Sequence, residues 1–416
     1  MLMRSCLFTG LKFWQKNHIK FIRIFNKLHL LCNTFLFTPK EWYPPRLCEV
    51  LIYDGVDKQY IEPYLKDRSF SVLFIRGESI NMLCLLRSIA TRYFWQGRAL
   101  HAYIQAFIKA SKPKLILTLI DNNSNFYELS KNSGVTTMFI QNGTRGVGDD
   151  IFGDIYSLDS LDNHVDHMLV FGSAIGKKYR SFISGETAII GSFRNNHINK
   201  SISASSSSVL FISEYKPRLK NNATFTFAGG DGVLVSYDNF FSSEYKVLNF
   251  LTQWCSENHK LLTIAGRHGP AYSPKLEAGE KNFYSSMLDK CSYNLISRSS
   301  KYSTYQLIDS AGIVVSIDST MGYEAMARGK KTALFSCRGI NIKDKWLNFG
   351  WPAELPDNGP FWSNHQDEKQ FKRIMDYLCT VSDQEFKETW QQYALEIMDY
   401  DPGNTHFIAL LDRILA

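Results

Sequence analysis

The sequence contains no apolar run of the roughly 20 residues that a membrane-spanning helix needs. Its eight cysteines are widely scattered, and no two of them have the close spacing of a zinc or redox motif. A short-period repeat of the solenoid kind is also missing. We therefore expect a cytoplasmic protein whose cysteines are reduced.

Residues 1–40 lack Asp and Glu but include seven Lys and Arg residues, which accounts for the formal net charge of +7. Lys12, Lys16, Lys20 and Arg23 recur at helical spacing, with apolar side chains between them. A basic amphipathic helix suits the face of an anionic inner membrane, to which the protein would be peripheral. A helix packed on the body of the protein, with solvated lysines, fits the pattern equally well. Nucleic acid is not an expected partner, because no binding module accompanies the basic residues.

The length of 416 residues is sufficient for two domains, each with its own core. Apolar β-branched runs alternate with helix-compatible segments, which is typical of parallel sheets with right-handed crossovers. A stretch rich in Ser, Asn and Lys at about 195–208 separates two such series. We expect an N-terminal α/β domain at 41–200, a C-terminal α/β domain at 201–365 and helices at 366–416.

The clearest strand–helix–strand unit begins at residue 311 and has a hydroxyl-rich turn after its first strand. Ser316, Asp318, Ser319 and Thr320 lie in that turn, and Gly329 ends the helix. Such a turn lies at the carboxyl edge of a parallel sheet, where free helix N–H groups bind anions. The hydroxyls suit phosphate oxygens, although a helix cap alone would also explain them.

Two more strand ends of the C-terminal half carry polar residues. Arg267 and His268 follow the strand at 260–266, where a cation and an imidazole could neutralise a departing nucleotide phosphate. A surface turn fixed by the proline that follows is the alternative. Ser213 and Glu214 end the first strand of this half. We expect them to contact the donor, that is, the substrate that carries this nucleotide.

In the N-terminal half, polar residues follow two consecutive strands. Asp121 and Asn122 end one strand, while Gln141, Asn142 and Arg145 end the next. Consecutive βαβ strands are usually neighbours, so these side chains are expected to bind the hydroxyls of an acceptor. Asp121 is the first candidate for a general base, unless it only balances a helix dipole.

Asp231, in a Gly-rich loop of the C-terminal half, is a further candidate catalytic carboxylate. A metal site is not expected. The Asp-x-Asp pattern at 399–401 falls between C-terminal helices and indicates a turn.

The segment 316–329 resembles the donor-site segment of GT-B glycosyltransferases, in which a hydroxyl-rich turn meets the donor phosphates. Glu324 falls at the Glu that contacts ribose or sugar hydroxyls in that family. The segments 120–129 and 139–143 are similar to paired segments of bacterial surface-carbohydrate biosynthesis proteins. The second also resembles the Gln-His-Gly exit of wall teichoic acid polymerases, with Asn142 in place of the His.

The turn Arg267-His268-Gly269-Pro270 resembles the His-Pro signature of bacterial sialyl- and Kdo-transferases, with Gly269 inserted. In those enzymes the His meets the phosphate of a CMP-sugar. This resemblance implies a CMP-sugar as the favoured donor and a catalytic role for His268.

Together, the resemblances imply a GT-B fold: two Rossmann-like domains with parallel sheets facing a cleft, a basic N-terminal helix and C-terminal helices. They imply a metal-independent glycosyltransferase without a cofactor. It would move a sugar, such as Kdo or another nonulosonic acid, from a nucleotide-sugar to lipopolysaccharide O-antigen, capsule or a lipid-linked acceptor. A nucleotide-sugar epimerase of the same fold and a non-catalytic polysaccharide-assembly protein are the alternatives.

Overall fold

The computed structural model describes residues 38–65, 67–147, 150–153, 163–201, 207–217, 224–226, 234–289 and 291–416. Most of the predicted basic segment, residues 1–37, and the candidate carboxylate Asp231 therefore lie outside the described residues. The chain divides into two compact units. The smaller unit comprises Met1–Lys58 and Leu65–Ile116, and the larger one comprises Gln59–Tyr64 and Leu117–Ala416.

In its described residues, the smaller unit contains short parallel strand pairs and three helices that pack against one another. The residues of its second strand are all buried, which explains the continuous apolar run there. Helix α4 (Ala99–Ser111) buries one face. Its C-cap residue, Lys112, has a left-handed backbone conformation. The elements are β1 (Lys40–Glu41), β2 (Val50–Tyr53), β3 (Phe70–Leu73), β4 (Ile80–Asn81), α2 (Met82–Ile89), α3 (Arg92–Trp95) and α4 (Ala99–Ser111).

Strand β5 (Leu115–Thr118) contains the boundary between the units, and the larger unit continues with parallel strands. Strand β7 pairs with β6 on one side and with β8 on the other. Helices alternate with these strands, as the sequence pattern predicts. The elements are α5 (Ser124–Tyr127), α6 (Leu129–Ser133), β6 (Thr136–Ile140), β7 (His164–Val170), α7 (Ser173–Arg180), β8 (Ser184–Ile189) and α8 (Phe193–His197).

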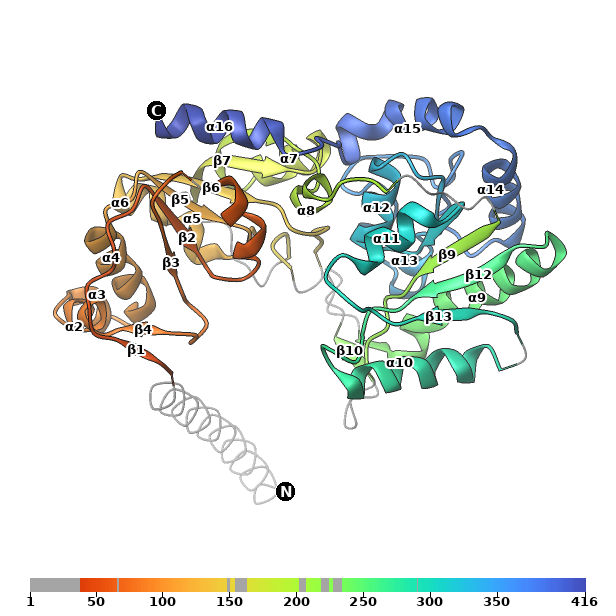
Figure 1. Cartoon of the computed structure of the whole chain (residues 1–416), viewed down its shortest axis with the longest axis horizontal. Helices are drawn as coiled ribbons and strands as arrows, with labels where there is room; N and C mark the ends of the chain where they lie inside the picture. The colour runs from red at the N-terminus through yellow and green to blue at the C-terminus, as the bar shows by residue number, and fades with distance from the viewer. Residues whose placement is uncertain are drawn as a thin grey trace, which may run out of the picture. The chain divides into compact units, whose positions relative to one another are not determined.

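A five-stranded parallel sheet of order β13-β12-β9-β14-β15 forms the second half of the larger unit. Its first strand in sequence, β9, lies in the middle, so that later strands are added first on one side and then on the other. Figure 1 shows α9 and α10 on one side of β9, β12 and β13, and α11 and α12 on the other. The elements are β9 (Ser208–Ile212), α9 (Tyr237–Glu257), β12 (Leu261–Ala265), α10 (Pro274–Met287), β13 (Asn294–Ile296), α11 (Ser303–Ser310), β14 (Ile313–Ser316), α12 (Thr320–Ala327) and β15 (Thr332–Leu334).

The C-terminal helices are α13 (Arg338–Ile342), α14 (Glu368–Thr380), α15 (Asp383–Ile397) and α16 (Thr405–Leu415). The last of them returns to the first half of the larger unit, where Phe407 packs on Phe193 with 5.0 Å between ring centroids. The predicted α/β class, with two parallel sheets and a helical C-terminus, is confirmed. Within the described residues, no helix combines the length and the apolar character needed to span a bilayer.

Candidate functional site

A pocket of about 500 Å³ lies at the carboxyl ends of the five-stranded sheet. Four of the five strands deliver a side chain to it: Glu214 follows β9, Arg267 follows β12, Arg298 follows β13, and Asp318 follows β14. Between β9 and β14 the strand order reverses, because β12 and β13 lie on one side of β9 and β14 and β15 on the other. Open α/β sheets bind ligands at this kind of switch point.

The N-terminus of α12 forms one wall of the pocket, with Ser319 and Thr320 among the lining residues. Ser319 is the N-cap residue, with extended backbone, and its hydroxyl accepts a weak 3.4 Å hydrogen bond from the Met321 N–H. The helix lies close to β14 because it carries Gly322, where a Cβ would be 2.5 Å from that of Ser316. Its first backbone N–H groups and the positive end of its dipole thus favour an anion here.

A loop from the first half of the larger unit reaches the same helix. The Thr144 N–H donates a hydrogen bond to Thr320 Oγ1 at 3.1 Å, and the two hydroxyl oxygens are 3.3 Å apart. Gly146 lies two residues after Thr144 in this loop. Trp346 packs so closely on it that a Cβ at position 146 would overlap the indole ring. The pocket therefore has walls from both halves of this unit.

The charge of the lining is predominantly positive. Two carboxylates, Glu214 and Asp318, face five cations. Burial lowers the pKa of one of these cations, Lys216, although nearby carboxylates oppose that effect. The pocket is consequently suited to a ligand with negative charge. The five lining cations are Arg194, Lys216, Arg267, Arg298 and Lys301.

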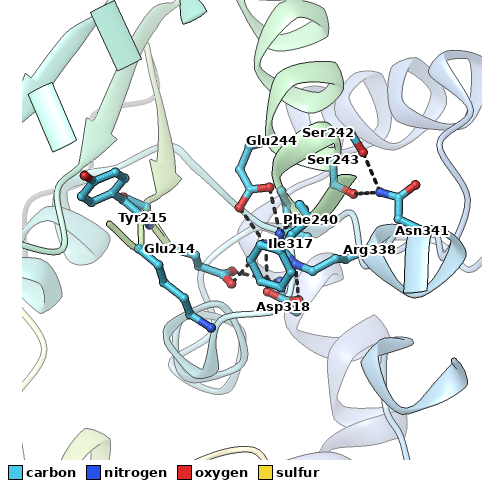
Figure 2. A network of polar contacts seen from close by, with 12 residues as sticks. Glu214, Tyr215, Phe240, Ser242, Ser243, Glu244, Ile317, Asp318, Arg338 and Asn341 are labelled. Atoms are coloured by element: carbon cyan, nitrogen blue, oxygen red, sulfur yellow. Dashed lines mark hydrogen bonds and ion pairs between the residues drawn. The ribbon is translucent and has the colours of Figure 1, made fainter. Parts of the chain in front are cut away.

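Beneath the pocket, the fully buried guanidinium of Arg338 holds three carboxyl groups together, as Figure 2 shows. It lies 2.7 Å from Glu244, 2.7 Å from Asp318 and 3.4 Å from Glu214. It also donates to the Phe240 carbonyl oxygen at 2.6 Å and lies over that residue's ring, 3.9 Å from the centroid. A single cation thus faces three acids, two of which line the pocket.

The pKa values of the three carboxyl groups are not all shifted in the same direction. Burial, and then the charge of Asp318, holds the pKa of Glu214 well above its usual value. Burial also raises the pKa of Glu244, in spite of Arg338. For Asp318 the burial effect is outweighed by Arg338 and by hydrogen bonds, so its pKa is lowered. Burial therefore favours the protonated form of Glu214, whereas Arg338 favours the ionised form of Asp318.

Six of the nine predicted donor-binding residues line the pocket: Ser213, Glu214, Arg267, Asp318, Ser319 and Thr320. The hydroxyl of Ser213 is engaged, because it donates to Glu280 and accepts from Tyr284 at 2.8 Å.

The other three predicted donor residues, Ser316, His268 and Glu324, are not among the lining residues. Ser316 is fully buried beneath α12. His268 donates its backbone N–H to Glu280 at 2.9 Å, and its ring meets that of Tyr215 edge-on.

Glu324, expected to face donor hydroxyls, points into the protein instead. Its carboxyl accepts hydrogen bonds from Ser192 at 2.5 Å and from Tyr305 at 2.8 Å. Burial raises its pKa, although both hydrogen bonds oppose that effect. Tyr305 lines the pocket, so Glu324 supports the lining from below rather than forming part of it.

The predicted acceptor residues hold the loop after β6 rather than face a ligand. Asp121, the candidate general base, is fully buried, and its carboxyl is occupied by Arg145 at 2.7 Å, by the Tyr179 hydroxyl and by the Asn142 N–H. These contacts argue against a base that meets an acceptor hydroxyl, and we assign Asp121 a structural role. Asn142 also accepts from Arg145.

The remaining acceptor candidates also make internal contacts. Gln141 donates to the Gly143 carbonyl oxygen at 3.0 Å and accepts from the Phe171 N–H at 2.9 Å. Asn122 donates to Asp150 at 3.3 Å. These residues shape the loop that presents Thr144 to the pocket. Arg298 and Arg338 were missed by the sequence reasoning, although both follow strands and the strand-end rule would have found them.

No group of three or more His, Cys, Asp or Glu side chains in the described part of the chain is arranged to hold a metal ion. Both carboxyl groups in the pocket lining, Glu214 and Asp318, are ion-paired with Arg338.

Residues 138–415 match the model of a protein family described as "putative O-antigen biosynthesis protein". No curated protein matches the sequence significantly. Among solved structures, a UDP-N-acetylglucosamine 2-epimerase homologue from Listeria monocytogenes is similar with 8% identity and a TM-score of 0.52, covering 87% of this chain and 95% of that one. MnaA of S. aureus with UDP also has 8% identity and a TM-score of 0.52, covering 88% and 96%. The wall teichoic acid polymerase TagF matches at 10% identity with a TM-score of 0.45, covering 88% of each chain. The likeness to the two structures with a TM-score of 0.52 confirms the predicted GT-B type of fold, with two Rossmann-like domains.

Proposed function

The chain belongs to this O-antigen biosynthesis family, and we propose that it is a glycosyltransferase that moves a sugar from a nucleotide-sugar to a surface polysaccharide or lipid-linked acceptor. One observation carries the proposal above the others. It is the positively charged pocket at the switch point of the five-stranded sheet, with the N-terminus of α12 in its wall.

The phosphates of the donor are proposed to bind at the N-terminus of α12. When a glycosyl bond breaks, its electron pair goes to the phosphate oxygen of the leaving nucleotide, where negative charge develops. The positive end of the α12 dipole and the guanidinium groups of Arg267 and Arg298 are suited to stabilise that charge. This arrangement needs no metal ion to neutralise the leaving group.

The two lining carboxyl groups are suited to hydroxyls of the ribose or the sugar. Burial favours the protonated form of Glu214, which can donate a hydrogen bond, and Arg338 favours the ionised form of Asp318, which can accept one. Arg338 keeps both in place from below. We propose that this pair orients the donor, whereas the cations hold its phosphates.

The identity of the donor's nucleotide stays a prediction. The resemblance at residues 267–270 favours a CMP-sugar, but of the two side chains that carry it, only Arg267 lines the pocket and His268 does not. The solved structure of MnaA contains UDP, so UDP is the main competitor. Kdo or another nonulosonic acid remains the sugar suggested by that resemblance.

A thermal-shift panel of CMP, CDP, UDP and GDP on the purified protein tests the donor site. A nucleotide at 100 times its Kd stabilises the fold by about 2.7 kcal/mol, which is readily detected as a rise in Tm. We expect one nucleotide to stabilise the wild-type protein but to have little effect on Arg267→Met. The control is Lys246→Met, at an exposed position of α9, and the same nucleotide should stabilise it as it does the wild type. If no nucleotide shifts the wild type, the non-catalytic assembly protein becomes the better interpretation.

The epimerase alternative is retained because the L. monocytogenes protein named for that activity shares the fold over 87% of this chain. Incubation of the stabilising nucleotide's sugar derivatives without an acceptor separates the two activities. An epimerase converts the sugar under these conditions, which NMR would detect as a new set of anomeric signals. A glycosyltransferase releases nucleotide in quantity only when an acceptor is added.

A further inference from the structure

The smaller unit carries an unusual concentration of exposed apolar side chains. Eight of the 14 large apolar residues that are exposed among the described residues fall between positions 42 and 100. Tyr43 is 85% exposed and Trp95 is 75% exposed, which is unusual for aromatic side chains of this size. The eight are Trp42, Tyr43, Leu47, Phe70, Leu86, Tyr93, Trp95 and Leu100.

Several of these residues belong to helices α2, α3 and the start of α4, which pack against one another. Helix α2 buries Cys84 and Ser88 and leaves Leu86 exposed. The Trp95 indole N–H donates to the Ile89 carbonyl oxygen at 2.8 Å, so the ring is held at the surface in a defined orientation. Figure 1 shows α2 and α3 beside each other at one end of this unit.

Trp42 and Tyr43 lie next to the same helices. Strand β1 pairs with β4, which runs directly into α2. The side chain of Asn81 caps α2 and donates to the Tyr43 carbonyl oxygen at 2.7 Å. We call the surface formed by Trp42, Tyr43, Leu86, Arg87, Arg92, Tyr93, Trp95 and Arg98 the aromatic–basic face.

The charge of this region has one sign. Residues 79–120 include six Lys and Arg residues and no Asp or Glu. Arg87, Arg92 and Arg98 are exposed on the same helices as the aromatic side chains. The acids that flank this stretch in the sequence are Glu78 and Asp121, and Glu41, which precedes Trp42, accepts a hydrogen bond from Ser79 at 2.8 Å.

We propose that the aromatic–basic face docks the protein on an anionic lipid surface. Trp and Tyr rings are suited to the headgroup level of a bilayer, and arginines extend their apolar stems along it while their charges meet anionic lipids. Residues 79–120 carry only positive charge, which matches the single sign of charge that an anionic bilayer presents.

The chain's own N-terminus supports the choice of a membrane. The segment 1–40, which carries seven positive charges and no negative one, joins the described structure at β1, beside this face. Two anionic-lipid signals on one unit bind a membrane far more firmly than one. The docking surface needs neither donor nor turnover, so it stands independently of the proposed glycosyl transfer.

Co-sedimentation of the full chain with vesicles tests the proposal, using phosphatidylcholine alone and phosphatidylcholine with 30% phosphatidylglycerol. We expect binding to the anionic vesicles only. Arg87→Gln with Arg92→Gln should weaken it about 25-fold, roughly fivefold for each arginine. Tyr93→Ser with Trp95→Ser should weaken it at least tenfold. The matched control, Tyr245→Ser with Lys246→Gln on α9, should bind as wild type, since Tyr245 is 53% exposed, like Tyr93.

Three outcomes would overturn the proposal. The first is unchanged vesicle binding by both face variants while Lys12→Gln, Lys16→Gln and Lys20→Gln together abolish it, which would assign all binding to the N-terminal segment. The second is a wild-type dimer in analytical ultracentrifugation that the Tyr93→Ser, Trp95→Ser variant loses, which would make the face a self-association surface. The third is retention of wild type, but not of the face variants, by a single-stranded oligonucleotide without any vesicle binding.

Discussion

Replacement of Arg338 by Met tests the role of the buried cation beneath the pocket. The side chain is fully buried and ion-paired with Glu244 and Asp318, both at 2.7 Å. Methionine has a similar length but no charge, so the variant leaves buried carboxylates without their counter-ion. Loss of one partner from a buried ion pair costs about 3–5 kcal/mol. For a unit of this size, we expect Tm to fall by roughly 5–15 °C.

The pH dependence of the loss has a defined sign. A carboxyl whose pKa is raised on folding stabilises the protein below its unfolded pKa, and the contribution is lost as pH rises through the folded pKa. Burial already raises the pKa of Glu214 and Glu244 in the wild type. Without Arg338, whose charge holds the pKa of Asp318 down, that carboxyl should join them. The stability deficit of the variant is therefore larger at pH 8 than at pH 5.

Thermal and urea unfolding of wild type and variant at pH 5, 6.5 and 8 provide the measurement. Arg267→Met is the control. Arg267 is an exposed cation on the same sheet edge and forms no ion pair with any carboxylate of the described residues. Its stability should change by less than about 0.5 kcal/mol. The reasoning is refuted if the Arg338→Met deficit shrinks as pH rises, or if its Tm at pH 8 lies within roughly 2 °C of the wild type.

Three further substitutions probe the positions that hold the loop and the strands. Asp121→Asn leaves the guanidinium of Arg145 buried without its carboxylate, so urea unfolding should show a loss of about 3 kcal/mol, whereas a purely catalytic base would cost activity but not stability. Glu324→Gln keeps an acceptor for the Tyr305 hydroxyl and removes a carboxyl of raised pKa. Its Tm should therefore fall less than that of the wild type between pH 5 and pH 8, and a steeper fall would contradict the pKa argument. Gly185→Ala should lower stability by more than about 2 kcal/mol in a thermal melt, because φ is +131° and the new Cβ would overlap a neighbouring carbonyl oxygen, and a melt like the wild type would refute this.

The sequence predicted best where a local pattern and a topological rule agreed. The turn after residue 316 has hydroxyl residues where a parallel strand meets a helix, and both Ser319 and Thr320 line the pocket. The same rule placed Glu214 and Arg267 at that edge correctly. The expectation for Glu324 came from the family resemblance instead, and its side chain points elsewhere, because the direction of a helical side chain depends on what packs against the helix. Here Ser192, from the loop after β8, meets the carboxyl.

The N-terminal half shows the other limit of sequence reasoning. Asp121 and Arg145 were placed at neighbouring strand ends, and they do meet, but as an ion pair with each other rather than as a site for a ligand. A polar residue at a strand end looks the same in the sequence whether it faces a cleft or a partner. The choice is made by side chains such as Tyr179, which lies 58 residues from Asp121 in the chain.

By itself, the sequence determined the alternation of strands and helices, the two parallel sheets and the polar turns at their edges, because these follow from hydrophobic periodicity and turn chemistry within short windows. Only the tertiary structure decided which of those polar residues line one pocket, which ones have shifted pKa values and which ones are paired beneath it. The physical reason is that burial and charge–charge distance set pKa values and ion pairs, and both depend on residues far apart in the chain. Arg338, joined to Glu214 across 124 positions, is the clearest example.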